Sequence, residues 1–163
     1  MDNINIIVAM DGNHAIGKGG RTPWRLSADM KHFAETTKEK AVVMGRKTWD
    51  SIPQKFRPLP GRENIVVTKN TELMISGCAV LCHPEQVLRI FKDQEVWVIG
   101  GGEMYNIFLP YARRLLITHV DTIIEDADTF FPEINGDWKS RPLFQHEVDE
   151  KNQFSFSVAE YTR

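Results

Sequence analysis

A series of short apolar runs, separated by turn-rich or helix-patterned segments, constrains the fold of this chain more than any other feature. Each run has the length of a β-strand, and near-continuous apolar strands are typical of a sheet that is covered on both faces. The pattern therefore predicts an α/β fold. The expected strands are Ile4–Met10, Ala41–Met44, Ile65–Thr68, Ala79–Leu81, Val96–Ile99 and Leu115–Val120.

Helix signals lie between the expected strands. Ser27 is expected to cap a helix that runs to about Thr37, because its hydroxyl can accept a hydrogen bond from a free amide of the first turn. Pro84 suits the first position of another helix, since its fixed φ and missing donor cost nothing there. A short helix is expected after Gly45, and a further one after the glycines at 100–102.

The C-terminal segment, from about Phe144, alternates between apolar and small or polar side chains. Phe154, Phe156 and Val158 would face inward, which predicts an antiparallel strand. The expected fold is thus a central, mixed but mostly parallel sheet that is flanked by helices. No repeat or linker divides the chain, and 42% hydrophobic residues suffice for one core, so residues 1–163 are expected to form a single domain.

Charge and cysteine content exclude several classes of protein. The 20 basic and 22 acidic residues are dispersed and give a net charge of -2, so neither nucleic acid nor a membrane is expected as a partner. No apolar segment approaches the roughly 20 residues that span a bilayer, and the N-terminus lacks a signal-peptide pattern. Cys78 and Cys82 fit a reduced, cytoplasmic protein, and without further ligands they predict no metal site.

Two glycine-containing segments are candidate phosphate sites. The segment Val96–Tyr105 joins an apolar strand to three glycines and a helix start, where a phosphate can approach the backbone closely. It lacks both the full dinucleotide-binding spacing and the lysine of a P-loop, so a tight turn without a ligand is the alternative. Gly45–Thr48 ends another expected strand and adds two cations and a hydroxyl group.

A further basic residue, Lys69, follows Thr68 at the end of a third expected strand. Together with Arg46 and Lys47, it favours a dinucleotide with an extra phosphate, and hence NADPH rather than NADH. The alternative is that each of these cations is an ordinary solvated surface group.

Asp29 shares one helical face with Phe33, four residues later. On that apolar face the carboxylate would need a partner, and burial would raise its pKa. The alternative is that Asp29 only stabilises the positive end of its helix from the first turn.

Taken together, a set of sequence blocks resembles the bacterial dihydrofolate reductase family in order and spacing. The blocks are Pro23-Trp24, Leu26-x-Ala28-Asp29, Phe33, Met44-Gly45-Arg46-x-Thr48-Trp49-x-Ser51-Ile52, Arg57-Pro58-Leu59-Pro60-Gly61-Arg62, Ile99-Gly100-Gly101-Gly102 and Phe131-Pro132. The resemblance extends from about Ile6 to the C-terminus. It implies a monomeric enzyme that reduces dihydrofolate with NADPH, and whose inhibitors are antifolates of the diaminopyrimidine or pteridine type.

The resemblance also implies a set of catalytic and substrate-binding residues. Asp29 would hold the N3 and 2-amino edge of the pterin by two hydrogen bonds, while Trp24 and Thr118 order the water and hydrogen bonds behind it. Water would then deliver the proton to N5. Arg62 would pair with the α-carboxylate of the glutamate tail. The implied substrate-binding residues are Ile7, Val8, Asp29, Phe33, Ile52, Arg57, Leu59, Arg62, Ile99 and Thr118.

For the cofactor, the resemblance implies contacts at the ends of several strands and in a lid formed by residues 11–24. The implied cofactor-binding residues are Ala9, Ile16, Gly17, Gly45, Arg46, Lys47, Thr48, Thr68, Lys69, Ile99, Gly100, Gly101, Gly102, Glu103, Met104 and Tyr105. The family carries a cis peptide where this chain has Gly100-Gly101. Three features depart from the familiar pattern: Gln54–Phe56 reads as an insertion before Arg57, Glu103 stands where an arginine often assists the 2′-phosphate, and the lid has Thr22 where a methionine is common.

Two other functions stay open. One is a nucleotide-binding module that keeps the fold but performs no reduction. The other is a pyrimidine reductase of riboflavin synthesis. Asp29, Phe33 and Arg62 argue against the second, because its substrate has neither a pterin edge nor a glutamate tail.

Overall fold

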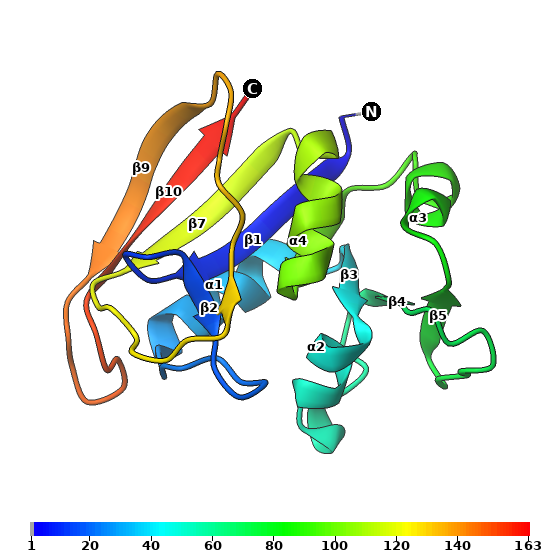
Figure 1. Ribbon diagram of the computed structural model, residues 1–163, viewed down its shortest axis with the longest axis horizontal. Coiled ribbons are helices and arrows are strands. Elements are labelled where there is room, and N and C mark those ends of the chain that lie inside the picture. The colour runs from blue at the N-terminus through cyan, green and yellow to red at the C-terminus, as the bar shows by residue number, and fades with distance from the viewer. Residues whose placement is uncertain (1) are drawn as a thin grey trace.

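The central sheet contains eight strands in the computed structural model, which describes residues 2–163 (Figure 1). In sheet order, the strands are β5 (Cys78–Leu81), β4 (Glu63–Val67), β3 (Ala41–Gly45), β6 (Val96–Gly100), β1 (Ile4–Met10), β7 (Arg114–Val120), β10 (Phe156–Thr162) and β9 (Lys139–His146). Neighbours from β5 to β7 run parallel, whereas β10 is antiparallel to both β7 and β9. The predicted mixed, mostly parallel sheet is therefore confirmed.

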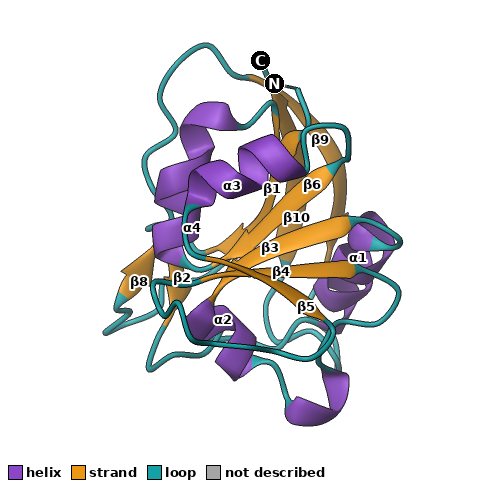
Figure 2. Ribbon diagram, turned by 90° about the vertical axis from the view of Figure 1, so that its right-hand side faces the viewer, coloured by secondary structure: helices purple, strands orange, loops and turns teal. Residues whose placement is uncertain are grey.

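Helices cover both faces of this sheet (Figure 2). The α-helices are α1 (Ser27–Thr37), α2 (Arg46–Ser51), α3 (Pro84–Ile90) and α4 (Gly102–Phe108), and the 3-10 helices are η1 (Gln54–Phe56) and η2 (Leu109–Tyr111). The segment that reads as an insertion before Arg57 thus forms η1. Helices α2 and α3 begin where the glycine and proline signals predicted them, whereas α4 begins at Gly102, the last of the three glycines, rather than after it.

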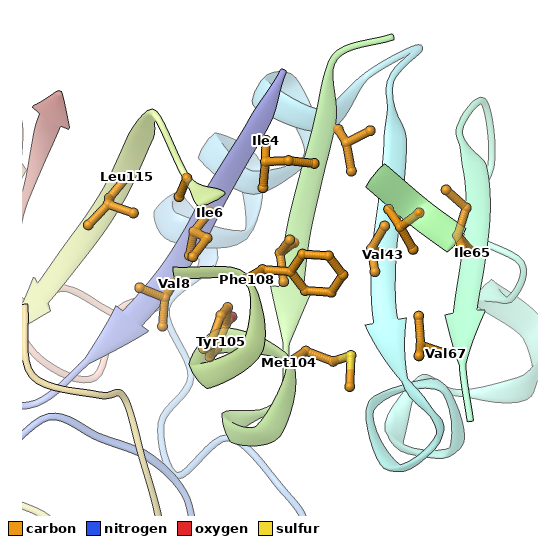
Figure 3. Packing of buried hydrophobic residues seen from close by; sticks show 14 of the residues in the cluster. Ile4, Ile6, Val8, Val43, Ile65, Val67, Met104, Tyr105, Phe108 and Leu115 are labelled. Atoms are coloured by element: carbon orange, nitrogen blue, oxygen red, sulfur yellow. The ribbon is translucent and has the colours of Figure 1, made fainter. Parts of the chain in front are cut away.

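Each face of the sheet has its own apolar core. Phe108 of α4 is fully buried against one face, in a cluster that also contains Ile6 of β1 (Figure 3). On the other face, Ile7 of β1 packs with Trp49 of α2, and Phe33 of α1 joins that cluster. Successive side chains of a strand point to opposite faces, which is why every residue of β1 except Asn5 is apolar.

The prediction that Ser27 caps its helix is wrong. Helix α1 begins at Ser27 itself, with Leu26 at the preceding position and no capping side chain from either residue. The first amides of the helix bind a distant loop instead: the Ala28 amide donates to Asn152 Oδ1 at 2.9 Å, and the Ser27 amide donates to the carbonyl of Lys151 at 3.1 Å. The loop before β10 therefore provides the cap, and no local pattern reveals it.

Some strand predictions need correction. Strand β4 spans Glu63–Val67, so it begins earlier and ends one residue before the expected Thr68. The C-terminal part contains two strands rather than one, and Phe154 lies before β10. A separate antiparallel pair, β2 (Ala15–Gly17) and β8 (Thr129–Phe130), was not predicted.

Both ends of the described chain lie near the N-terminal ends of strands β1 and β7 (Figure 1). Arg113 contacts both: its Nε lies 3.4 Å from Asp2 Oδ1, and its carbonyl accepts a hydrogen bond from the Arg163 amide at 3.3 Å. None of the helices within residues 2–163 has the length and apolar character needed to cross a bilayer.

Candidate functional site

A cavity of about 1210 Å³ opens at the carboxyl ends of the central parallel strands. Its wall includes residues from the carboxyl-terminal halves of β1, β3, β4 and β6, and it is completed by α1, the start of α4 and the segment that contains β2. In open α/β sheets, ligands bind outside the carboxyl ends of the strands. This cavity is therefore the candidate site.

Asp29 lies in the wall of this cavity, on the first turn of α1. The Thr118 hydroxyl of β7 donates a hydrogen bond to its Oδ1 at 2.6 Å. Burial raises the pKa of the Asp29 carboxyl above its ordinary value, while the Thr118 hydrogen bond and the charge of His32 oppose that rise. The carboxylate therefore points inward, and the purely helix-stabilising interpretation is insufficient.

Apolar side chains surround this carboxyl group. Ile7, Phe33 and Ile99 line the cavity. Ile52 and Leu59 are not part of its wall, but they are half-buried and pack against the same cluster as Phe33. The pocket beside Asp29 is thus apolar on one side, and in such a pocket a few polar groups fix the orientation of a ligand.

The remaining residues expected near this end lie differently. Val8 and Trp24 line the cavity. Arg62 lies outside the wall, with its guanidinium 6.0 Å from the Phe33 ring. Arg57 does not reach the wall either, because it donates to the Trp49 carbonyl at 2.9 Å. The structure thus brings together every expected substrate-binding residue except Ile52, Arg57, Leu59 and Arg62.

Every residue of the expected cofactor set lies in the wall of the same cavity. The Gly100-Gly101 peptide is cis, as the resemblance implies. A side chain at Gly100 would place its Cβ 3.3 Å from Thr48 Oγ1, so the absence of a side chain leaves the strand end open to a ligand. Tyr105 is buried behind this turn, and its hydroxyl donates to the Ile7 carbonyl at 2.9 Å.

Charged side chains lie at the entrance of this cofactor half. Lys47, Lys69 and Arg46 supply positive charge, and Arg46 Nε also contacts Asp50 at 3.1 Å. Glu103 is the acidic residue beside them. The cations outnumber this acid, so the wall suits a phosphorylated dinucleotide.

The segment that includes β2 covers one side of the cavity. The Gly19 amide donates to Asp128 Oδ2 at 2.8 Å, and the Asp128 amide donates to the Gly17 carbonyl at 3.1 Å. The hydrogen bond from Gly19, with a second from the Thr129 hydroxyl, holds the pKa of Asp128 below its ordinary value. These contacts attach Gly17 and Gly19, both within the expected lid, to the loop that leads to β8.

Sequence reasoning missed several wall residues. Cys82 and His83 follow β5 directly, and the rule that ligands gather at the ends of parallel strands would have identified them. Thr129 reaches the wall because β8 pairs with β2. No local signal predicts that pairing, because the two strands lie more than a hundred residues apart in the chain.

Comparisons with known proteins agree on one family. The family model described as dihydrofolate reductase matches residues 3–163. The dihydrofolate reductase of Mycobacterium tuberculosis (strain ATCC 25618 / H37Rv) is 43% identical over 141 residues, which cover 85% of this chain and 86% of that protein. The dihydrofolate reductase of Bacillus subtilis (strain 168) is 39% identical over 162 residues, with coverage of 98% and 94%.

A solved structure shows the same similarity. Dihydrofolate reductase from Enterococcus faecalis, in a complex with NADP(H) and RAB-propyl, aligns with a TM-score of 0.89 and 35% sequence identity. The alignment covers 98% of this chain and 95% of that one. The similarity therefore includes all of the elements that form the cavity.

Proposed function

Because this chain belongs to the dihydrofolate reductase family, we propose that it reduces 7,8-dihydrofolate to 5,6,7,8-tetrahydrofolate with NADPH, in support of one-carbon metabolism. The observation that carries the proposal is a single cavity with a buried carboxyl group, Asp29, at one end and the glycine turn with its cations at the other. One end suits a pterin, and the other suits a phosphorylated dinucleotide.

Asp29 would hold the pterin. Thr118 occupies one lone pair of its Oδ1, and the remaining lone pairs can accept two hydrogen bonds from N3 and the 2-amino group. A bidentate arrangement of this kind is strong and directional. The apolar side chains of Ile7 and Phe33 keep water from competing with these hydrogen bonds.

The reduction requires a hydride at C6 and a proton at N5. NADPH, when bound, supplies the hydride. Gly45, Gly100 and Gly101 would let its phosphates approach the backbone, and Arg46, Lys47 and Lys69 would neutralise their charge. Trp24 and Thr118 would order the water that delivers the proton, while Asp29 polarises the ring.

Residues 1–163 would carry out this reaction as one domain and as a monomer, because a single chain lines both ends of the cavity. Diaminopyrimidine and pteridine antifolates present the same hydrogen-bonding edge as the pterin. They are therefore proposed to bind Asp29 in competition with dihydrofolate.

The test follows the loss of NADPH absorbance after dihydrofolate is added, in the wild type and in Asp29→Asn. We expect turnover by the variant to fall by roughly a hundredfold or more at neutral pH, since positioned acid-base groups contribute about 10²–10⁴-fold. The loss should be smallest at low pH, where the substrate is protonated from solvent. Asp137→Asn, an exposed carboxylate, is the matched control.

Two results would contradict the proposal. Binding of NADPH without its oxidation would indicate a nucleotide-binding module. Reduction of a pyrimidine intermediate of riboflavin synthesis, without reduction of dihydrofolate, would indicate the other reductase class.

A further inference from the structure

Asp11 follows β1 directly and is almost completely buried, with 2% of its surface exposed. Its Oδ1 accepts hydrogen bonds from the amides of Asn13 at 2.7 Å and Ala15 at 2.9 Å. Its Oδ2 accepts a third from the amide of Ile124 at 2.8 Å. A buried carboxylate is costly unless it is hydrogen-bonded, and bonds from amides to an ionised oxygen are strong.

The two oxygens of Asp11 bind two segments that are far apart in sequence. Oδ1 fixes the turn of residues 11–15, which leads directly into β2. Oδ2 fixes the loop that follows β7. The Gly12 amide also donates to the Thr122 carbonyl at 3.1 Å, and a Cβ at Gly12 would lie only 2.8 Å from Ile123 Cδ1. The carboxylate therefore bridges two closely packed loops.

Both loops continue into the wall of the cofactor half. After the turn, β2 contributes Ile16 and Gly17, and after the second loop, β8 contributes Thr129. The contact between them is close, since a Cβ at Gly17 would lie 3.3 Å from Thr129 Cβ. A shift of either loop would therefore move the wall against which the nicotinamide half is expected to bind.

We propose that Asp11 is a positioning residue for the cofactor: its carboxylate bridges the 11–15 turn to the 122–124 segment, and thereby sets β2 and β8 for productive NADPH binding. This inference rests on the proposed function. Asp11 does not line the cavity, so it acts through Ile16, Gly17 and Thr129.

The variant Asp11→Asn breaks the bridge selectively. An amide has one acceptor oxygen, and the turn offers two donors to it, from Asn13 and Ala15. The NH₂ group of the asparagine then faces the Ile124 amide, which cannot donate to it. The turn is thus retained while the 122–124 segment is released.

Kinetics with this variant provide the first measurement. We expect the KM for NADPH to rise and kcat to fall, each roughly tenfold, because small misplacements of a bound reactant are costly. The primary isotope effect with NADPH deuterated at the transferred position should also rise. A purely structural role would lower only the fraction of active molecules, and would change neither KM nor the isotope effect.

The matched control is Asn5→Ala. Asn5 is a buried polar residue of the same strand, and its Nδ2 donates to the carbonyls of Asn3 and Val96, both at 3.3 Å, at the opposite end of β1. This variant should lose stability without a change in the KM for NADPH. An equal rise of KM in both variants would overturn the inference.

Amide hydrogen exchange tests the bridge without any activity. In Asp11→Asn, the amides of Gly12 and Ile124 should exchange faster relative to those of Asn13 and Ala15. Unchanged exchange at Ile124, or an unchanged KM for NADPH, overturns the inference. If the wild type does not oxidise NADPH with dihydrofolate, the proposed function fails, while exchange and the Kd of NADPH still decide the role of Asp11.

Discussion

Asp29 is the residue at which activity and stability conflict. Burial raises the pKa of this carboxyl above its ordinary value, so the folded protein binds the proton more tightly than the unfolded chain does. As the pH rises from the ordinary value of 3.8 through the raised value of the folded state, the free energy of unfolding must therefore fall. Ionisation of this buried carboxyl group therefore costs the folded protein stability.

Asp29→Asn should accordingly be more stable than the wild type at neutral pH, because the asparagine needs no ionisation. The gain should vanish below pH 3.8, where the wild-type carboxyl is protonated in both states. Urea denaturation at the two pH values measures this difference. A variant that is equally destabilised at both would show that Asp29 has no destabilising charge.

Thr118 makes the larger of the two contributions that limit the rise of the Asp29 pKa, the other being the charge of His32. Its hydroxyl donates to Asp29 and lowers the pKa of that carboxyl, so Thr118→Val should raise the pKa further. We expect the KM for dihydrofolate to increase roughly tenfold, since a hydrogen bond to a charged group contributes about 1.5–3 kcal/mol. The acid limb of the pH profile should move to higher pH. A profile that stays in place would exclude this role for Thr118.

Asp29 and Thr118 also show why the sequence alone could not decide the orientation of a single side chain. The spacing from Asp29 to Phe33 was compatible with an inward carboxylate or with a helix-stabilising one. The contact that decides between them comes from Thr118, 89 positions away. The position of Arg57 outside the cavity wall was likewise not predictable, because no side-chain pattern reveals its hydrogen bond to the carbonyl of Trp49.

At the scale of elements, the turn between β6 and α4 is the part most sensitive to a side chain. Gly100 has a φ of 132°, which L residues rarely adopt, and a Cβ there would lie 3.3 Å from Thr48 Oγ1. Gly100→Ala should therefore lose about 1–3 kcal/mol of stability from backbone strain and should also bind NADPH more weakly.

Gly136→Ala is the control that separates the loss of stability from the loss of NADPH binding. Gly136 has a φ of 104°, and nothing lies within 4 Å of the Cβ that alanine would add. Urea denaturation should show a loss of stability in both variants, and titration with NADPH should show weaker binding only in Gly100→Ala. Equal affinity of both variants for NADPH would remove the glycine turn from the cofactor site.

The elements that could be predicted share one property. Strands β1, β3, β6 and β7 are buried on both faces, and burial imposes an apolar run that is visible in the sequence. Strand β9 has mostly exposed side chains, so its eight residues carry no such pattern. Strands β2 and β8 have three and two residues, and they are defined by their mutual pairing alone.

At the scale of the whole molecule, a series of ion pairs connects strands from the centre of the sheet to its antiparallel edge. Lys40 Nζ lies 2.9 Å from Glu95 Oε2, and Arg114 contacts both Glu95 and Glu160 at 3.5 Å. Arg141 of β9 completes the series at 2.9 Å from Glu160. Glu95 directly precedes β6, so these pairs link the start of β6 to β7, β10 and β9, away from the cavity.

Glu95→Gln tests this series. Burial tends to raise the pKa of Glu95, but hydrogen bonds from Lys40 and Trp97 and the charge of Arg114 hold it below its ordinary value of 4.5. Its stabilisation is therefore present above pH 4.5 and is lost as the pH falls through the lower value of the folded state. Because the side chain is 37% exposed, the variant should lose only about 0.2–1 kcal/mol at neutral pH.

Thermal denaturation across this pH range, at low and high salt, measures the effect. The difference between Glu95→Gln and the wild type should shrink below pH 4.5 and in high salt. NADPH oxidation should be unaffected, because none of these groups lines the cavity. A difference that persists at acid pH would point to packing rather than charge.

Asp2 and Arg163 both contact Arg113, so the two ends of the described chain lie close together in space. The ends lie at the start of β1, about 20 Å from its other end, where the cavity opens, since seven strand residues rise about 3.3 Å each. A short linker between Arg163 and Asp2 should therefore yield a circular permutant, opened at the exposed Gly136, that retains the same sheet and cleft. An affinity tag or a fused reporter at either end would likewise stay clear of the ligands.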